Sequence, residues 1–296
     1  MDDNHSSYWV STLGASTDYF DVEGVRTRAL HAGDGPVTLM LHGMGGHLEN
    51  FVYNVVPVSA QGKAHNYAID LLGHGMNSRP ERSYTFDDMI DHVLHFMDAI
   101  GQRKVSLVGL SLGSLVAAWI ALRHPERVER MALTTGFGMY LDGSKPEEIE
   151  AAFARIRDSN LKLMRTPTLD TVRDRLRPLA HNPATISEEM VQTRLHIYNQ
   201  PGAERVIRAF VEDFYQQRDK FILTSARLRQ IQTETLVIWG EHNNPPVDYA
   251  RRAAALIPNA KFHVCANSGH WPHVEAANDY NRVVAEFLLG NATVSG

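Results

Sequence analysis

A serine between two glycines has the spacing used for nucleophilic catalysis. Residues 109–113 read Gly-Leu-Ser-Leu-Gly, directly after the apolar run Val105–Val108 and before a stretch compatible with a helix. A tight turn from strand to helix holds such a serine in a strained conformation, and the glycines let neighbouring backbones approach closely. The N-terminus of the following helix favours a developing anion. Because five-residue patterns of this kind also occur by chance, Ser111 is a candidate nucleophile that needs partners elsewhere in the chain.

A glycine-rich segment earlier in the chain can supply hydrogen-bond donors for that anion. Residues 41–47 read Leu-His-Gly-Met-Gly-Gly-His and follow the apolar run Val37–Leu41. We expect the amide of Met44, together with the amide of Leu112, to hold the oxyanion of a tetrahedral intermediate. The alternative is a plain glycine-rich loop or a phosphate cradle, but no lysine–threonine ending accompanies these glycines.

The chain contains 15 histidines, so position decides which one is the candidate base. His270 lies in Asn-Ser-Gly-His-Trp-Pro, residues 267–272, after the last predicted strand and before the C-terminal helix. An imidazole titrates near neutral pH, so it can take the proton of Ser111 and return it to a leaving group. A histidine this far downstream of the serine also fits the chain order nucleophile, acid, base.

An α/β architecture is needed to position these residues. Unbroken apolar runs are typical of strands buried on both faces, and helical patterns lie between most of the runs. The alternation predicts a mainly parallel sheet with helices on both faces. The predicted strands are two short pieces near residues 8–10 and 25–29 and the runs Val37–Leu41, Tyr67–Ile69, Val105–Val108, Val128–Leu133, Leu236–Trp239 and Lys261–Val264. The single cysteine, Cys265, follows the last run and is expected to be a buried, inert thiol.

Between residues 141 and 226 the pattern changes to charged, amphipathic helical stretches interrupted by prolines. No repeat or flexible linker separates this segment from the rest of the chain. We therefore predict a core of residues 1–140 and 227–296, with a helical lid of residues 141–226 inserted into it. Within the core, the apolar stripe of a helix from Thr85 to Ile100 is expected to pack in the interior and to form no binding site.

Composition argues against several classes of partner. The 296 residues are 44% hydrophobic and carry a net charge of -5, so there is no basic field to attract nucleic acid or an anionic membrane surface. The first residues lack a basic start followed by an apolar run, and no stretch reaches membrane-spanning length, which predicts a cytoplasmic protein. We expect a small-molecule substrate, no metal, no organic cofactor and, from the prevalence of symmetric dimers, a homodimer.

Taken together, five segments resemble the α/β-hydrolase superfamily across nearly the whole chain. They are residues 41–47, residues 68–75, the Ser111 turn, His-Pro-Glu-Arg-Val at 124–128 and Gly-His-Trp at 269–271. The resemblance implies a mostly parallel eight-stranded sheet with helices on both faces and a helical lid insertion. The Gly-His-Trp ending and the lid segments 192–194 and 200–202 are similar to the meta-cleavage-product hydrolases, which split carbon–carbon bonds in ring-opened aromatics.

That narrower resemblance implies a set of substrate-binding residues. Arg194 stands where these enzymes keep a lid arginine that binds the carboxylate and oxo-enol end of the substrate, a task suited to a bidentate guanidinium. Asn50 matches a polar residue of the site, and Gly43 is counted with it among the substrate-binding residues. Trp271 is expected to pack beside His270 and to line the pocket. The alternatives are a surface arginine, a turn asparagine and a core tryptophan.

The sequence departs from the family at the third catalytic position. After the run Leu236–Trp239 the family usually has an aspartate, and here Asn243 occupies that place. An asparagine carbonyl can accept the proton on Nδ1 of His270, but it brings no charge to stabilise the imidazolium, and in a serine protease the same change costs about four orders of magnitude in rate. Three accounts stay open: Asn243 orients the ring, Glu241 or Asp248 reaches it instead, or the protein has left hydrolysis for another chemistry. We favour Asn243, because carbon–carbon hydrolases act on a substrate that first tautomerises to an activated ketone.

Two further departures lie beside the nucleophile. Leu110 and Ser114 stand where this subfamily more often has a polar residue and a glycine. The polarity of the pocket next to Ser111 is therefore left open by the sequence.

The leading hypothesis is hydrolysis of a carbon–carbon bond in a 2-hydroxy-6-oxohexa-2,4-dienoate type of ring-fission product. In it Ser111 attacks the substrate or activates water, and His270 carries the proton. The nearest alternative is a carboxylesterase or lactonase on the same fold. A cofactor-independent oxygenase, with a histidine base and no essential nucleophile, is more distant. A ligand receptor that keeps the fold without turnover is the alternative outside enzymes, because the usual acid is missing.

Overall fold

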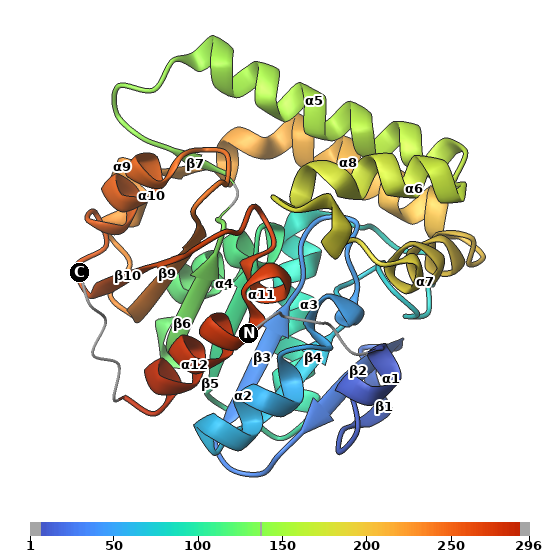
Figure 1. Ribbon diagram of the computed structural model, residues 1–296, viewed down its shortest axis with the longest axis horizontal. Coiled ribbons are helices and arrows are strands. Elements are labelled where there is room, and N and C mark those ends of the chain that lie inside the picture. Colours follow the sequence, from blue (N-terminus) through green and yellow to red (C-terminus); the bar gives the residue numbers. More distant parts are fainter. Residues whose placement is uncertain (1–6, 137, 291–296) are drawn as a thin grey trace.

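Eight strands form one sheet in the computed structural model, which describes residues 7–136 and 138–290 (Figure 1). The strand order is β1-β2-β4-β3-β5-β6-β9-β10; β2 is antiparallel to both of its neighbours, and the remaining pairs are parallel. The predicted fold class is thereby confirmed. The strands are β1 Ser16–Val22, β2 Val25–Ala32, β3 Val37–Leu41, β4 His65–Ile69, β5 Val105–Leu110, β6 Val128–Thr134, β9 Glu234–Gly240 and β10 Ala260–Cys265.

Helices cover both faces of this sheet, as predicted. Helices α2 (Val55–Gly62) and α12 (Ala277–Leu288) pack against each other in front of the sheet in Figure 1, whereas α3 (Phe86–Ala99) and α4 (Leu112–Arg123) lie behind it. Because both faces are covered, all six residues of the central strand β5 are buried, which explains its apolar sequence without alternation. The shorter helices of the core are α9 Ser225–Leu228, α10 Val247–Ala254 and α11 Pro272–Glu275.

Helix α3 begins and ends where the sequence predicts. The Thr85 hydroxyl accepts a hydrogen bond from the Asp88 amide (3.1 Å), and the Asp88 carboxylate accepts one from the Thr85 amide (2.9 Å), so the first turn is capped in both directions. Ile100 caps the other end, ahead of Gly101 with a φ of 71°. The predicted apolar stripe is part of the core and includes the fully buried residues Met89, Val93, Phe96 and Met97.

One predicted strand is wrong, and one strand is not visible in the sequence pattern. Residues Tyr8–Ser11 form the short helix α1, because the Ser7 hydroxyl accepts a hydrogen bond from the Val10 amide and caps the turn. The aromatic residues there favour strands, but a run of three is too short to show a period. Strand β1 is missed for the opposite reason: most of its residues are exposed, so it lacks an apolar face to alternate.

Four helices of the predicted lid segment lie above the sheet in Figure 1, and three of them, α5, α6 and α7, line a cavity together with residues at the ends of several parallel strands. They are α5 Pro146–Arg165, α6 Leu169–Leu176, α7 Glu188–Tyr198 and α8 Ala203–Gln217. A two-stranded parallel sheet, β7 Met139–Tyr140 with β8 Leu223–Thr224, joins the two ends of the segment. The division at residues 141 and 226 stays a prediction. None of the described helices is long and apolar enough to cross a membrane.

Candidate active site

Ser111 occupies a strained turn between β5 and α4. It is the N-terminal cap of α4, with a φ of 52° and a ψ of -111°. A positive φ is unfavourable for a residue with a side chain, so the surrounding structure must hold it. The Ser111 amide donates to the Thr134 carbonyl on the neighbouring strand β6 (2.9 Å), which fixes the turn against the sheet. The residue lines the large cavity between the sheet and the lid.

Close contacts explain both glycines of the motif. A Cβ on Gly113 would lie 2.0 Å from the Leu41 carbonyl oxygen, and one on Gly109 would lie 2.4 Å from the Ser114 amide nitrogen. Neither distance is compatible with a side chain, so α4 can approach strands β3 and β5 this closely only with glycine at both positions. The close approach is what places a helix N-terminus beneath the serine.

The two predicted oxyanion donors have amides that are free to donate. Among the described residues, neither the Met44 amide nor the Leu112 amide gives a hydrogen bond to another group of the chain. Met44 lines the cavity, whereas the Leu112 side chain is fully buried, so only its backbone at the first turn of α4 is available. Both amides can therefore serve an anion that forms at Ser111.

A buried histidine, His42, fixes the start of the glycine-rich loop. Its Nε2 accepts a hydrogen bond from the Leu71 amide (3.0 Å), so the ring proton is on Nδ1, which donates to the Gly43 carbonyl (2.8 Å). Burial, reinforced by a neighbouring histidine, holds the pKa of His42 well below its usual value, and the ring stays neutral. From the lid side, the Tyr198 hydroxyl donates to the Gly45 carbonyl (2.6 Å).

A buried carboxylate anchors the rest of this loop. Asp70 is fully buried and accepts hydrogen bonds from the Leu48 amide, the Met76 amide and the Arg28 guanidinium, each at 2.8 Å. Arg28 also pairs with Glu49 at 2.8 Å. Sequence analysis assigned Asp70 no role, although a lone acid after an apolar strand was a signal that it is held inside.

Asn243 contacts the candidate base. Its Oδ1 lies 3.0 Å from Nδ1 of His270, so the ring donates the Nδ1 proton and keeps its lone pair on Nε2. The His270 amide donates to the Leu179 carbonyl of the lid segment (2.8 Å), and the Thr135 hydroxyl donates to the His270 carbonyl (3.0 Å). The loop is thus held from both the lid and the core.

The two rival carboxylates lie elsewhere. Glu241 is exposed and accepts a hydrogen bond from the Asn267 amide (2.9 Å), and Asp248 is exposed in the first turn of α10. Among the described residues, neither forms a hydrogen bond or ion pair with His270. This geometry favours the account in which Asn243 orients the ring.

The surroundings of His270 favour the neutral base. Burial lowers the pKa of His270 to about 4, and the positive charge of Arg175 acts in the same direction. The ring is therefore uncharged at neutral pH, as a general base must be. The imidazolium that forms on proton transfer, however, lacks the carboxylate that stabilises it in the usual triad.

The candidate residues share one cavity of about 1030 Å³. Its lining includes the predicted residues Gly43, Met44, Asn50, Ser111, Arg194, Asn243, His270 and Trp271. No hydrogen bond joins the Ser111 hydroxyl to the His270 ring within the described residues. In many enzymes such bonds tighten only when substrate is bound, so the geometry of proton transfer has to form on binding.

Arg194 is buried in the lid and not on the surface. The residue lies on α7 and is 4% exposed. Its guanidinium is 5.5 Å from the centre of the Trp271 ring and 3.5 Å from Asn50 Oδ1. Both partners are also buried. The structure therefore brings together the three substrate-binding side chains that the family resemblance implies, in one wall of the cavity.

The open question of polarity beside the nucleophile has a structural answer. Leu110 lines the cavity, so the wall next to Ser111 is apolar. Ser114 is buried in α4, and its hydroxyl donates to the carbonyls of Gly109 (2.9 Å) and Thr134 (3.0 Å). Its polar group is therefore used to hold the turn.

Sequence reasoning missed a second arginine of the lid. Arg175, on α6, lines the cavity. The signal was its spacing from Val172 and Leu176, which are fully buried. Residues at i, i+3 and i+4 share one helix face, so Arg175 lies on the inward side of a helix that otherwise resembles a solvated one.

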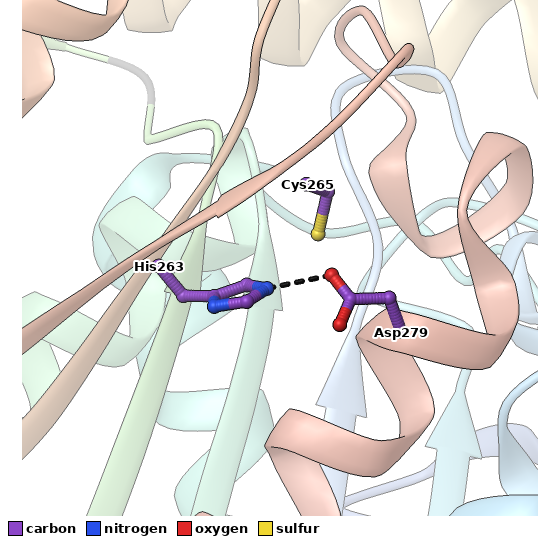
Figure 2. A group of neighbouring side chains, drawn as sticks. All are labelled: His263, Cys265 and Asp279. Carbon is purple, nitrogen blue, oxygen red and sulfur yellow. Dashed lines mark hydrogen bonds and ion pairs between the residues drawn. The ribbon is translucent and has the colours of Figure 1, made fainter. Parts of the chain in front are cut away.

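A group of potential metal ligands lies outside the cavity. His263 and Cys265 on β10 and Asp279 on α12 face one another, with ligand atoms within 4.8 Å (Figure 2). His263 Nε2 is 2.6 Å from the Asp279 carboxylate, which also accepts a hydrogen bond from Arg282 (2.7 Å). These bonds fasten the last strand to the last helix. Cys265 is free and fully buried, and burial raises the pKa of its thiol, which agrees with the predicted inert cysteine.

The fold and the cavity define an enzyme class that the comparisons confirm. Residues 36–277 match the model of the family described as alpha/beta hydrolase fold, and the chain belongs to that family. The predicted similarity to meta-cleavage-product hydrolases is also confirmed, and the protein is an α/β-hydrolase with such enzymes among its relatives.

Three of these relatives cover nearly the whole chain. A 2-hydroxymuconate semialdehyde hydrolase from Pseudomonas putida is 28% identical over 90% of this chain and 91% of its own length. A 2-hydroxy-6-oxononadienedioate/2-hydroxy-6-oxononatrienedioate hydrolase from the same organism is 30% identical over 86% and 89%. The solved structure of a meta-cleavage product hydrolase from Pseudomonas fluorescens IP01 has a TM-score of 0.78 at 25% identity, over 95% of this chain and 100% of that one.

Proposed function

We propose that this hydrolase cleaves a carbon–carbon bond in a ring-fission product of the 2-hydroxy-6-oxohexa-2,4-dienoate type. The observation that carries the proposal is the buried Arg194 guanidinium, which lines the same cavity as Ser111 and His270. A buried cation next to a nucleophile and a base suits a substrate with both a carboxylate and a reactive carbonyl. The relatives named as hydrolases of such compounds support it.

In the proposed binding mode, Arg194 takes the carboxylate and oxo-enol end of the substrate. A guanidinium offers two parallel N–H donors to a carboxylate, and the hydrogen bonds are stronger inside a cavity that excludes water. Asn50 and Trp271 already contact Arg194 and hold its plane. With that end fixed, the distal ketone of the substrate is left to reach Ser111.

In the proposed reaction, the bound dienol first tautomerises, which makes the carbon next to the ketone a better leaving group. Ser111 then attacks the ketone carbon, or directs a water to it, and His270 Nε2 takes the proton. The amides of Met44 and Leu112 hold the oxyanion. When the carbon–carbon bond breaks, its electron pair goes to the departing carbon, which receives the proton from His270. On the covalent route, water then releases the acyl group from Ser111, so one water is consumed overall.

The proposed substrate also suits Asn243. A neutral partner leaves the His270 imidazolium less stabilised, which is costly for a reaction limited by the attack of a deprotonating serine on a poorly reactive ester. The tautomerised ketone is more electrophilic, so a weaker serine–histidine pair suffices. We therefore assign Asn243 as the residue that orients His270.

The test is turnover of a series of ring-fission products by the purified protein. These dienolates are yellow, so hydrolysis is followed as loss of their visible absorbance. The expected result is loss of colour with at least one member and no loss with Ser111→Ala. No colour loss with any member of the series contradicts the proposal.

Two alternative functions on the same fold can be distinguished by further assays of the wild-type protein and Ser111→Ala. A solved enol-lactonase structure from Burkholderia xenovorans LB400 shares the fold alone, with a TM-score of 0.72 at 21% identity over 91% of this chain and 99% of that one. Rapid turnover of p-nitrophenyl esters without dienolate cleavage favours a carboxylesterase or lactonase. Oxygen consumption that survives Ser111→Ala favours a cofactor-independent oxygenase. The location and assembly that go with our proposal are the cytoplasm and a homodimer.

A further inference from the structure

A second cation of the lid, Arg175, faces the cavity and has no partner. Its Nε atom is buried and forms no hydrogen bond, and no carboxylate pairs with its guanidinium within the described residues. A buried charge without a partner is unfavourable, so side chains in this position are normally paired with an acid or placed at the surface. Arg28 shows the usual arrangement, with two carboxylates at 2.8 Å.

Among the residues that the structure describes, no acidic group acts on Arg175. The titratable groups that act on it electrostatically are Arg194, which is also a cation, and the neutral groups Tyr198, Tyr215 and His270. Burial and the charge of Arg194 lower the pKa of Arg175, so both features oppose its charged form. The Tyr215 hydroxyl is likewise buried without a hydrogen-bond partner in the described part of the chain.

The lining of the cavity is cationic as a whole. The one carboxylate among the described lining residues is Glu148, which is exposed and pairs with Lys145 at 2.8 Å. The lining cations are Lys145, Arg155, Arg175, Arg194 and Arg252. Of these, Lys145, Arg155 and Arg252 are exposed, which leaves the half-buried Arg175 and the buried Arg194 as the two cations shielded by the lid.

We propose that Arg175 binds a second carboxylate of the substrate, so that the preferred ring-fission product is a dicarboxylate with one acid group on each side of the scissile bond. This inference rests on the proposed function, in which Arg194 takes the dienoate carboxylate. The two arginines lie on different lid helices, α6 and α7, so each can hold its own acid group. Hydrolysis of such a substrate releases a dicarboxylic acid from the ketone side.

Binding of that carboxylate also changes the base. The positive charge of Arg175 is one of the two causes that lower the pKa of His270, the other being burial. A carboxylate paired with Arg175 offsets this charge, so the imidazolium that forms during the reaction becomes less unfavourable. The dicarboxylate thereby supplies part of the stabilisation that the neutral Asn243 does not.

The test compares two ring-fission products of the same chain length, one ending in a carboxylate beyond the ketone and the other in the primary amide. Wild type is expected to favour the carboxylate in kcat/KM by about tenfold or more, as for hydrogen bonds to a charged group. Arg175→Gln should remove this preference by lowering kcat/KM for the carboxylate far more than for the amide, and Arg175→Lys should restore part of it. Arg252→Gln, which changes an exposed cation of the same cavity, is the matched control and should keep the preference.

Two further measurements separate binding from a structural role. The acid limb of kcat/KM should move to higher pH in Arg175→Gln, because the pKa of His270 rises when the cation is removed. Arg175→Met should unfold at the temperature of wild type or above it, because it removes an unpaired buried charge. A clear fall in the unfolding temperature shows that the guanidinium is structural and overturns the inference.

The outcomes also distinguish the inference from the proposed function. If wild type cleaves both compounds equally well, or Arg175→Gln slows both equally, the second carboxylate site is wrong while carbon–carbon hydrolysis stands. If wild type cleaves neither these two compounds nor any other dienolate, the proposed function fails and this inference fails with it.

Discussion

Buried charges in the floor of the cavity have partners within the chain, whereas Arg175 in its roof has none among the described residues. The floor includes the loops after β3 and β5, which line the cavity, and it is supported from beneath by Asp70, which receives two amides and a guanidinium. The roof includes the lid helices α5, α6 and α7. There Arg194 has one long contact with Asn50 and a ring beneath it. We infer that folding supplies the partners of the charged groups in the floor, whereas a bound ligand supplies those of the arginines in the roof.

Replacing the candidate nucleophile in the floor should cause the largest loss of activity. Ser111→Ala is expected to lower kcat for dienolate cleavage by about four orders of magnitude or more, because loss of a catalytic serine removes the covalent route. Stopped-flow absorbance measures the residual rate, and acylation of wild type by an organophosphate checks that the serine is reactive. Retention of substantial activity would assign the chemistry to His270 alone.

Removing the anchor of the floor should affect stability more than any lid substitution. Asp70→Ala leaves Arg28 buried and two amides without an acceptor, so we expect a loss of about 3 to 5 kcal/mol in the free energy of unfolding. Denaturant unfolding measures this loss. Arg194→Ala is the matched substitution in the roof. An equal loss in both variants would erase the distinction between the two regions.

The identity of the orienting residue is tested at the edge of the floor. Asn243→Ala should lower kcat about a hundredfold, since the Nδ1 proton of His270 loses its acceptor and the ring loses its orientation. Glu241→Ala and Asp248→Ala should leave kcat unchanged, because both carboxylates are exposed and without a described contact to the ring. If Asn243→Ala is fully active and one of the others is not, our assignment is wrong.

Removing the charge of Arg194 in the roof should weaken substrate binding with little loss of stability. Arg194→Gln is expected to raise KM by about 10- to 100-fold for a dienoate, the usual effect of losing hydrogen bonds to a charged group. Steady-state kinetics gives KM, and thermal unfolding gives stability. A large fall in kcat with KM unchanged would instead place Arg194 in the chemical step.

Acid pH should weaken the whole protein progressively. Burial lowers the pKa of His74 and His270 to about 4 and of His92 and His273 to about 3. In the unfolded chain these rings take up protons below about pH 6.5, whereas in the folded protein they do so only near pH 4 or 3. The unfolded state therefore binds more protons between these values, and the free energy of unfolding falls as the pH falls, by about 1.4 kcal/mol per pH unit for each such histidine. Urea unfolding at a series of pH values measures the slope, and a flat profile from pH 6.5 to 4.5 contradicts it.

The floor was largely predictable from the sequence because its residues lie in short motifs and at the ends of apolar strands. Gly109 and Gly113, on either side of Ser111, reflect close contacts with neighbouring backbone that no other residue permits. Strands β3 to β6 and β9 were visible as apolar runs because the sheet is covered on both faces there. The pairing of Asp70 with Arg28 was not predictable, because the two residues come from antiparallel neighbouring strands whose register cannot be read from composition.

The roof was predictable only as a set of helices. Arg194 was singled out through family resemblance, while Arg175 was overlooked because a charged residue in an amphipathic helix usually faces solvent. Which face of α6 turns inward depends on how the lid packs on the core, and that is decided by contacts far apart in the chain. The wrong strand at residues 8–10 has a local origin, since a single cap by Ser7 outweighed the strand preferences of its neighbours.

The bond from the Tyr198 hydroxyl to the Gly45 carbonyl has a consequence for engineering this enzyme. Tyr198 follows Arg194 by one helical turn on α7, so the proposed substrate-binding arginine and the hydroxyl that holds the glycine-rich loop share one short helix. If the lid is replaced by that of another hydrolase, the Gly45 carbonyl loses this hydrogen bond unless the new lid keeps a hydroxyl at position 198. The exchange would then change the conformation of the glycine-rich loop as well as the substrate range.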